Sequence, residues 1–313
     1  MWIDKNRSWI GTVLLGGFAL PHIWTRVIIV TAISVAVTVL YREVPAFHFN
    51  ITPTPFALIG LPLGIFLGFR NNTAYDRFWE GRKLWGALVN TSRSFTRQLL
   101  TLLEFQHDAT DADPDALAAF ERDMVRLVIA YVHALRHHLR DSDPFEELAR
   151  ILPAEVAESF RGEENVPIAM LQHMADKLVL ARRKNWVHPF HVIVLEESLT
   201  SMTDIQGACE RIKSTPIPFS YTVLMHRIVA GYCTLLPFGL ESTIGWATPV
   251  VVMAISYAFF GLDAIGDEIE DPFGEDVNDL PLHAISRMIE INLRRRIKDD
   301  GPEPLRPTRG VLS

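Results

Sequence analysis

Cysteine is scarce in this chain of 313 residues, and positive charge does not dominate it. With only Cys209 and Cys233, the chain cannot form the disulfide framework of a small secreted protein, and a reducing environment suits both thiols. A formal net charge of −7 argues against a general nucleic-acid-binding role, which needs a basic surface. The sequence also has no nucleophile elbow, no phosphate-binding glycine loop and no CxxC pair. We therefore predict that the protein is not an enzyme.

The overall composition lies between that of a soluble protein and that of a membrane protein. Hydrophobic residues make up 49% of the chain and the mean hydropathy is +0.15, both high for a soluble protein. Charged residues make up 21%, too many for a chain that lies wholly in the membrane. We therefore expect a few membrane spans together with a sizeable water-exposed part.

Four apolar stretches are candidate membrane spans, at about 27–42, 54–70, 219–240 and 242–264. The fourth is the clearest, because it has about the twenty residues that a hydrocarbon core needs. These stretches contain very few ionisable residues, which argues against an intramembrane enzyme and against a proton-coupled transporter. The N-terminal stretch 1–24 lacks the small residues of a signal-peptide cleavage site, so we expect an amphipathic helix in the membrane interface there.

The distribution of Lys and Arg predicts the orientation in the membrane. The connection 43–53 has neither residue, and the link between the third and fourth spans offers only Glu241. Six basic residues follow the second span: Arg70, Arg77, Arg82, Lys83, Arg93 and Arg97. Basic loops stay on the cytoplasmic side, so we predict that residues 71–216 and both termini are cytoplasmic.

The long middle region, 71–216, is typical of an all-α fold. Asp113-Pro114 and Asp143-Pro144 each look like a helix N-cap followed by proline at the first helical position. Arg161-Gly162 indicates a break between helices, and alternation typical of strands is nearly absent. We predict one domain over residues 1–298, followed by a proline-rich, disordered tail at 299–313.

The second span contains two columns of residues spaced four apart. Gly60, Gly64 and Gly68 share one helical face, and Leu61, Ile65 and Phe69 share the neighbouring face. A glycine edge permits close helix packing beside a column of bulky apolar side chains, which favours a helix lining a narrow, dry passage. The ordinary alternative is the apolar stripe that any buried helix carries.

Two polar clusters have both a functional and a structural interpretation. An acidic block follows the fourth span, with Glu268, Glu270, Asp271, Glu275, Asp276 and Asp279. Its carboxylates suit a hard cation, or they form a solvated cap on the following helix at 280–296. His133 and His137 lie four apart, a spacing that can bind a metal, although a packed or solvated helix surface is the more ordinary explanation.

Three blocks of the sequence resemble the bestrophin family of ion channels, in its bacterial branch. They are IFLGFRNNTAYDRFWEGRKLWG in the second span, IKSTPIPFSYT before the third, and EIEDPFGEDVNDLPL after the fourth. The last is similar to the family signature Asn-Pro-Phe-Gly-Glu-Asp. The blocks occur in the order of the family, and the resemblance covers roughly residues 9–296.

The resemblance implies a homopentameric funnel in a bacterial inner membrane, with a narrow neck formed by the second span of each subunit. The positions that match the three apolar rings of the neck are Leu61, Ile65 and Phe69, and the glycines Gly60, Gly64 and Gly68 lie beside them. The resemblance also implies a second, cytoplasmic constriction just after a proline, and Phe190 after Pro189 matches it.

In animal bestrophins the acidic block forms a calcium clasp, and the resemblance carries this site over position by position. Asp276 and Asp279 match the carboxylate ligands, while Glu268 and Asp271 match positions that contribute carbonyl groups. This chain departs from the pattern, because Val277-Asn278 interrupts the aspartates and Asp271 replaces the usual asparagine. Fewer carboxylates imply weaker binding, so we expect no gating by calcium.

Together these observations predict a multi-pass channel subunit that conducts small monovalent ions, with chloride or another anion favoured. A sodium or other monovalent-cation channel of the same fold is one alternative. A non-conducting membrane scaffold or receptor is another, and a membrane enzyme that uses a metal on His133 and His137 is the third. The expected partners are further copies of the chain, the lipid bilayer and the permeant ions, without nucleic acid.

Overall fold

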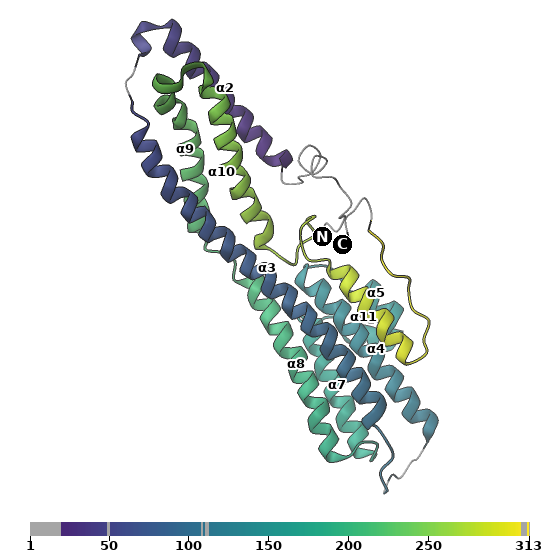
Figure 1. Ribbon diagram of the computed structural model, residues 1–313. Coiled ribbons are helices and arrows are strands. Elements are labelled where there is room, and N and C mark those ends of the chain that lie inside the picture. The colour runs from purple at the N-terminus through teal and green to yellow at the C-terminus, as the bar shows by residue number, and fades with distance from the viewer. Residues whose placement is uncertain (1–19, 49–50, 108, 110–112, 308–311, 313) are drawn as a thin grey trace. The chain divides into compact units, whose positions relative to one another are not determined.

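A computed structural model describes residues 20–48, 51–107, 109, 113–307 and 312, and its regular elements are helices (Figure 1). Within these residues the only β-type pairing is an isolated bridge between Leu103 and Val187, so the predicted all-α fold is confirmed. The elements are α2 (Leu20–Glu43), η1 (Pro45–Phe47), α3 (Thr54–Leu102), α4 (Pro114–Leu139), α5 (Phe145–Ile151), α6 (Ala154–Ser159), α7 (Val166–Arg183), α8 (Pro189–Ser214), α9 (Phe219–Ile244), η2 (Gly245–Ala247), α10 (Thr248–Glu270) and α11 (Leu282–Arg296). The predicted interfacial helix at 1–24 lies mostly outside the described residues.

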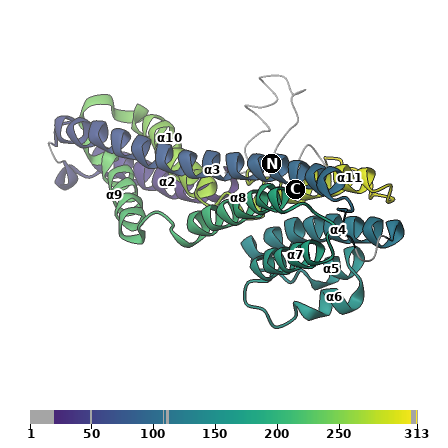
Figure 2. The same ribbon diagram turned by 90° about the horizontal axis from the view of Figure 1, so that it is seen from below.

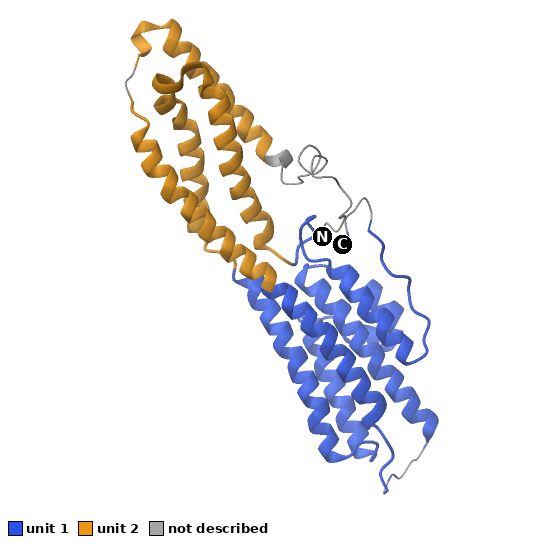
Figure 3. Cartoon of the chain, viewed as in Figure 1, with its two compact units in different colours: residues 1–3, 80–215, 273–313 blue, residues 4–79, 216–272 orange. Residues whose placement is uncertain are grey.

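The chain divides into two compact units, which alternate along the sequence (Figure 3). Of the described residues, unit 1 contains 80–215 and the C-terminal part from 273, and unit 2 contains 20–79 together with 216–272. Helix α3 passes from unit 2 into unit 1 without a break. The prediction of one channel domain over 1–298 stays a prediction.

Unit 2 is a helical bundle in which α2 packs against α9 and α10. Its buried core consists of Ile23, Val27, Val30, Leu63, Leu67, Met225, Val229, Cys233, Leu236, Val252 and Phe260. On α2, the buried residues Ile23, Val27, Val30 and Ser34 recur at intervals of four and three, the spacing of a narrow packing face. Small residues such as Ser34, and Ser256 on α10, allow helices in a membrane to approach closely.

Two stretches of the described chain, Ile23–Glu43 and Phe219–Glu270, are long and apolar enough to cross a membrane by length and composition. They contain three of the four predicted spans. The predicted span at 54–70 is not among them, because its apolar run ends at Arg70. The number of crossings therefore stays a prediction.

The turn between the third and fourth spans lies a few residues later than predicted. Helix α9 continues through Glu241 to Ile244, and the chain turns at Gly245–Ala247. Gly245 has φ +54°, and a Cβ atom there would collide with the guanidinium of Arg42. Glu241 is buried and pairs with Arg42 Nε at 3.2 Å, so it belongs to the helix packing and not to an exposed link.

Unit 1 is built around α4, which is buried along most of its length and packs against α5, α7, α8 and α11 (Figures 1 and 2). The hydroxyl of Tyr131 in α4 donates to the carbonyl oxygen of Met202 in α8 at 3.0 Å. Asp113 caps α4 as predicted, since its side chain accepts from the Asp115 N–H at 3.0 Å. Gly162, with φ +98°, lies in the predicted break before α7.

Two boundaries in unit 1 differ slightly from the prediction, and the tail is partly described. Asp143 accepts from the Phe145 N–H at 2.8 Å, but α5 begins at Phe145 and not at Pro144. Helix α11 begins at Leu282, two residues after the predicted start. In the tail, residues 299–307 contain no helix or strand, and Asp299 accepts from Arg126 Nε at 2.9 Å.

Candidate functional site

The predicted pore column lies on the face of α3 that its own chain leaves uncovered. Leu61, Ile65 and Phe69 are 73%, 50% and 60% exposed. Leu63 and Leu67, two residues after Leu61 and Ile65, are buried in the core of unit 2. Residues two apart in an α-helix lie about 200° apart around the axis, so the two sets face opposite ways. The column is therefore not the buried stripe of the helix, which was its ordinary alternative.

The glycine edge beside the column has two parts. A Cβ atom on Gly60 would lie 2.6 Å from the hydroxyl oxygen of Tyr232, so Gly60 permits close packing of α3 on α9. Cβ atoms on Gly64 and Gly68 would meet nothing within 4 Å in the described chain. The predicted close packing thus occurs within the subunit only at Gly60, and the other two glycines are open to a neighbour outside the chain.

Arg70, which follows the column directly, is buried and paired with two carboxylates of α10. Its Nη1 donates to Asp263 Oδ1 at 2.8 Å, and its Nη2 binds Asp267 Oδ1. His226 Nδ1 lies 2.9 Å from Asp263 Oδ2, and Arg26 Nη1 lies 3.7 Å from the same oxygen. A buried charge needs such partners, because an unpaired one costs several kcal/mol. The cluster therefore fixes the end of the column to α2, α9 and α10.

This ion-pair cluster is the main feature that the sequence interpretation missed. Asp263 was placed in a span thought to be almost free of ionisable groups, and Arg70 was assigned to the basic segment after the second span. The available signal was the four-residue spacing of Asp263 and Asp267, which puts both carboxylates on one helical face. An arginine at the end of an apolar helix could have been matched to that face.

The same cluster is the place where the described residues bring metal-ligating atoms closest together. Ligand atoms of His226, Asp263 and Asp267 lie within 4.8 Å of one another. The guanidinium of Arg70 already pairs with both carboxylates, and it would repel a cation bound between them. The geometry therefore supports a structural ion-pair network and not a metal centre.

Phe190 lies in the first turn of helix α8. It is the second residue of α8, its side chain is 75% exposed, and its N–H donates to Nδ1 of the capping residue His188 at 3.3 Å. The rings of His188 and Phe190 lie 5.3 Å apart. The segment thus presents Phe190 from a capped helix start, and its role as a constriction stays a prediction.

The acidic block forms a turn whose described contacts are structural. Glu268 and Asp271 belong to unit 2, and Asp276 and Asp279 belong to unit 1. The carboxylate of Asp279 is buried and accepts from the backbone N–H of Asp276 at 2.7 Å, while the Asp276 side chain is exposed. One oxygen of Asp279 thus stabilises its own turn, and the weak calcium binding expected from the sequence stays a prediction.

Phe273 of the same block is a packing residue. It is fully buried, its backbone oxygen accepts from Arg140 Nε at 3.1 Å, and a Cβ atom on Gly81 would lie 3.1 Å from its ring. Gly81 belongs to the block in the second span and Phe273 to the block after the fourth. Two of the three blocks that carry the resemblance are therefore in direct contact.

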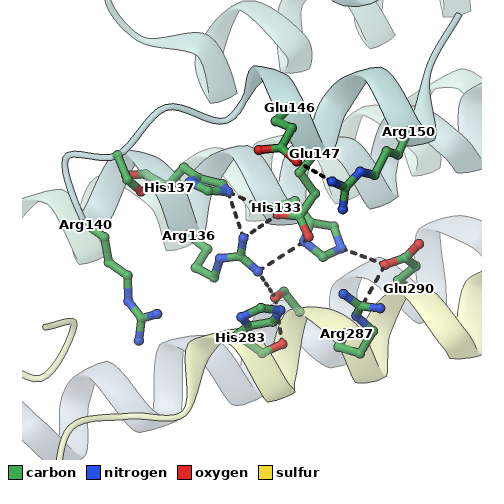
Figure 4. A network of polar contacts seen from close by, with 12 residues as sticks. His133, Arg136, His137, Arg140, Glu146, Glu147, Arg150, His283, Arg287 and Glu290 are labelled. Carbon is green, nitrogen blue, oxygen red and sulfur yellow. Dashed lines mark hydrogen bonds and ion pairs between the residues drawn. The ribbon is translucent and has the colours of Figure 1, made fainter. Parts of the chain in front are cut away.

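His133 and His137 belong to a network of buried ion pairs in unit 1, shown in Figure 4. His133 Nδ1 lies 3.1 Å from Glu147 Oε1, and its Nε2 lies 3.0 Å from Glu290 Oε2. His137 Nε2 lies 3.0 Å from Glu147 Oε2, and its Nδ1 lies 2.7 Å from the Ser142 hydroxyl. All four ring nitrogens have protein partners in the described chain, so the geometry favours an ion-pair network and gives no support to a metal site on this pair.

The protonation states in the network follow from its geometry. Burial alone would lower the pKa of His133, but its hydrogen bonds to Glu147 and Glu290 outweigh burial and raise that pKa. Burial would likewise raise the pKa of Glu147, yet the hydrogen bonds from His133 and His137 hold it well below its usual range. For His283, burial together with the charge of Arg136 lowers the pKa to about 4.

A model of the bacterial and fungal bestrophin proteins matches residues 1–295. The chain belongs to the bestrophin family. Among bestrophins of known structure, a bacterial homologue from Klebsiella pneumoniae has a TM-score of 0.82 at 32% identity, over 89% of this chain and 99% of that one.

Curated relatives are named voltage-dependent anion channel-forming proteins. The relative from Ralstonia nicotianae is 39% identical over 94% of this chain and 91% of its own length. The relative from Mesorhizobium japonicum is 40% identical over 93% and 90%, and that from Escherichia coli K12 is 36% identical over the same shares. The resemblance inferred from three short blocks is thereby confirmed across nearly the whole chain.

Proposed function

We propose that the protein is the pore-forming subunit of a homopentameric anion channel, with its neck at Leu61, Ile65 and Phe69. The observation that carries the proposal is the exposed apolar column on the face of α3 opposite the buried one. The subunit leaves these bulky apolar side chains exposed. If several copies assemble around one axis, the columns would meet there and line a pore. The names of the relatives support anions as the permeant ions.

The physical mechanism is control of conduction by a hydrophobic constriction. Rings of leucine, isoleucine and phenylalanine resist wetting, so an ion that passes them loses hydration and meets a barrier. Small rotations of α3 would widen or close the passage. The ring edge of Phe69 is the positive end of its quadrupole, so an edge pointing at the axis would favour anions. We assign the second, cytoplasmic constriction to Phe190.

Reversal potential in an asymmetric potassium chloride gradient tests the proposal. An anion channel reverses near the equilibrium potential of chloride. Reversal near that of potassium would support the alternative of a monovalent-cation channel with the same fold. A purified protein that carries no current and has the mass of one or two copies in detergent would instead support a non-conducting scaffold.

We propose further that calcium does not control opening, since Asp279 is engaged in its own turn. The bilayer current should therefore stay unchanged when free calcium is raised from nanomolar to micromolar concentrations. The double substitution Asp276→Ala with Asp279→Ala should leave that insensitivity unchanged. A wild-type current that rises steeply with micromolar calcium would contradict this.

The proposed location is the bacterial inner membrane, with four crossings and both termini in the cytoplasm. The excess of basic residues after the second span supports this orientation. Fusion of a cytoplasm-specific reporter to the C-terminus should give an active reporter, and a periplasm-specific reporter at the same place should be silent.

A further inference from the structure

The C-terminal part of α3 and the last turn of α11 enclose a basic hollow of about 410 Å³ in unit 1. Its lining residues are Arg93, Thr96, Arg97, Leu100, Thr101, Asn292, Leu293 and Arg296. Five of these residues belong to α3. Four of them lie three, four, seven and eight positions after Arg93, so all five share one helical face. The hollow thus lies between one face of α3 and the C-terminal turn of α11.

Three arginines surround this hollow without a carboxylate among its lining residues. Within the described part of the chain, Arg93, Arg97 and Arg296 have no ion pair, whereas their neighbour Arg294 binds both Glu290 and Asp299. Arg93 and Arg97 are four residues apart on α3, where like charges repel. A bound anion would relieve this repulsion.

The walls between the arginines are partly apolar and partly polar. Leu100 and Leu293 supply apolar surface, and Leu293 is buried. Thr96 is also buried, and its hydroxyl has no hydrogen-bond partner in the described chain. A buried hydroxyl without a partner is unfavourable, so an acceptor oxygen of a ligand would stabilise it.

We propose that this hollow binds a phosphomonoester whose remainder is apolar. Arginine forks match phosphate oxygens, and three positive charges suit a dianion better than a monoanion. The volume of about 410 Å³ exceeds that of a halide by far, since it equals roughly fourteen water molecules at about 30 Å³ each. The leucines would hold an apolar group attached to the phosphate. The site is separate from the proposed pore column, and its test requires no ion conduction.

Calorimetric titration of the full-length protein in phospholipid-free detergent at low salt tests the proposal, with phenyl phosphate as the probe. We expect saturable binding that is tighter than that of inorganic phosphate and of benzoate. The double variant Arg97→Gln with Arg296→Gln should bind at least about tenfold more weakly, because it loses two charged hydrogen-bond donors to the phosphate.

The matched control carries Arg122→Gln with Arg183→Gln, which removes the same charge from exposed positions away from the hollow. It should bind phenyl phosphate as the wild type does. If the double variant of the hollow lost its fold, the single variant Arg93→Gln should still show weakened binding. The proposal is overturned by equal binding to wild type and hollow variants, or by benzoate binding as tightly as phenyl phosphate.

A phosphomonoester can be a free metabolite or a lipid headgroup, and a second arm separates these sources. Wild type and double variant are washed in detergent after reconstitution with phosphatidic acid, and the retained lipid is measured. Retention by the wild type alone identifies the lipid source, and binding of phenyl phosphate without such retention identifies a soluble ligand. The absence of both overturns the proposal.

Discussion

At the scale of single residues, the most consequential finding is the burial of Arg70 next to the pore column. Its two carboxylate partners belong to α10, and His226 of α9 contacts both of them. Phe69 and Arg70 are adjacent, so a residue that faces outward is followed by one that is fixed in the core. The ion pairs therefore define the rotation of α3 at the end of the column.

Replacing Arg70 should strongly destabilise the subunit. Arg70→Gln leaves the buried Asp263 with only His226 and the half-exposed Arg26 as partners, and breaking a buried ion pair costs about 3–5 kcal/mol. We expect a clear loss of thermal stability in detergent, measured by circular dichroism. Arg227→Gln, an exposed arginine of α9, is the control. Equal melting temperatures for both variants would show that the cluster does not stabilise the fold.

The His133 network predicts a pH dependence of stability. The pKa of His133 is raised in the folded state, so its stabilising contribution is complete below the unfolded value of about 6.5 and is lost as pH rises through the folded value. Above pH 6.5, His283, with a pKa of about 4, and the carboxylate of Glu147, with its lowered pKa, no longer titrate. This range therefore isolates the contribution of His133.

The variant His133→Gln should melt below the wild type at pH 6.5, and the gap should narrow as pH is raised. Exposed His107→Gln is the control, and its melting temperature should follow that of the wild type throughout. A gap of constant size across this pH range would mean that protonated His133 does not contribute to stability.

At the scale of elements, α3 combines three surfaces on one helix. One face packs in unit 2, the opposite face carries the column, and the glycine edge between them is partly open. The spacing of the glycines and of the apolar column could be derived from the sequence. Which face the chain itself buries could not, since it depends on the partners that α2, α9 and α10 provide.

The three glycines should respond differently to the same change. Gly60→Ala places a methyl group 2.6 Å from the Tyr232 hydroxyl, so the subunit itself should be destabilised. Gly64→Leu and Gly68→Leu meet open space in the subunit, so they should leave it folded and weaken assembly. Thermal melting and native mass spectrometry measure the two effects separately. Intact pentamers in both leucine variants would exclude the open glycines from a subunit interface.

The helices and their caps could be predicted from short stretches of sequence. The boundaries that were predicted wrongly have physical reasons. Asp113 and Gly162 marked their boundaries correctly because capping and a positive φ are properties of a few neighbouring residues. The turn after α9 was predicted too early because a glutamate between two apolar stretches suggests an exposed loop. In the structure Glu241 is buried in the helix and pairs with Arg42, which is distant in sequence. Local sequence patterns do not show which charged residues from distant segments will pair.

At the scale of the whole molecule, membership of the bestrophin family connects the described sites with conduction. The three sequence blocks were sufficient to recognise the family, and the match extends over residues 1–295. The position of the neck, the number of subunits and the permeant ion remain proposals, since they concern surfaces shared between copies. The alternative of a metal on His133 and His137 has no support in the geometry, since carboxylates of Glu147 and Glu290 already pair with His133.

Single-channel conductance of two phenylalanine variants tests the central proposal most directly. Phe69 belongs to the column. Phe66, on the same helix and also exposed, lies about 60° from Phe69 around the helix axis, on the side away from Ile65 and Leu61. If the column forms the neck, Phe69→Ala lowers the hydrophobic barrier and raises conductance several-fold, while Phe66→Ala leaves it near the wild-type value. Equal conductance of Phe69→Ala and wild type, or a larger effect from Phe66→Ala, would contradict a neck at Leu61, Ile65 and Phe69.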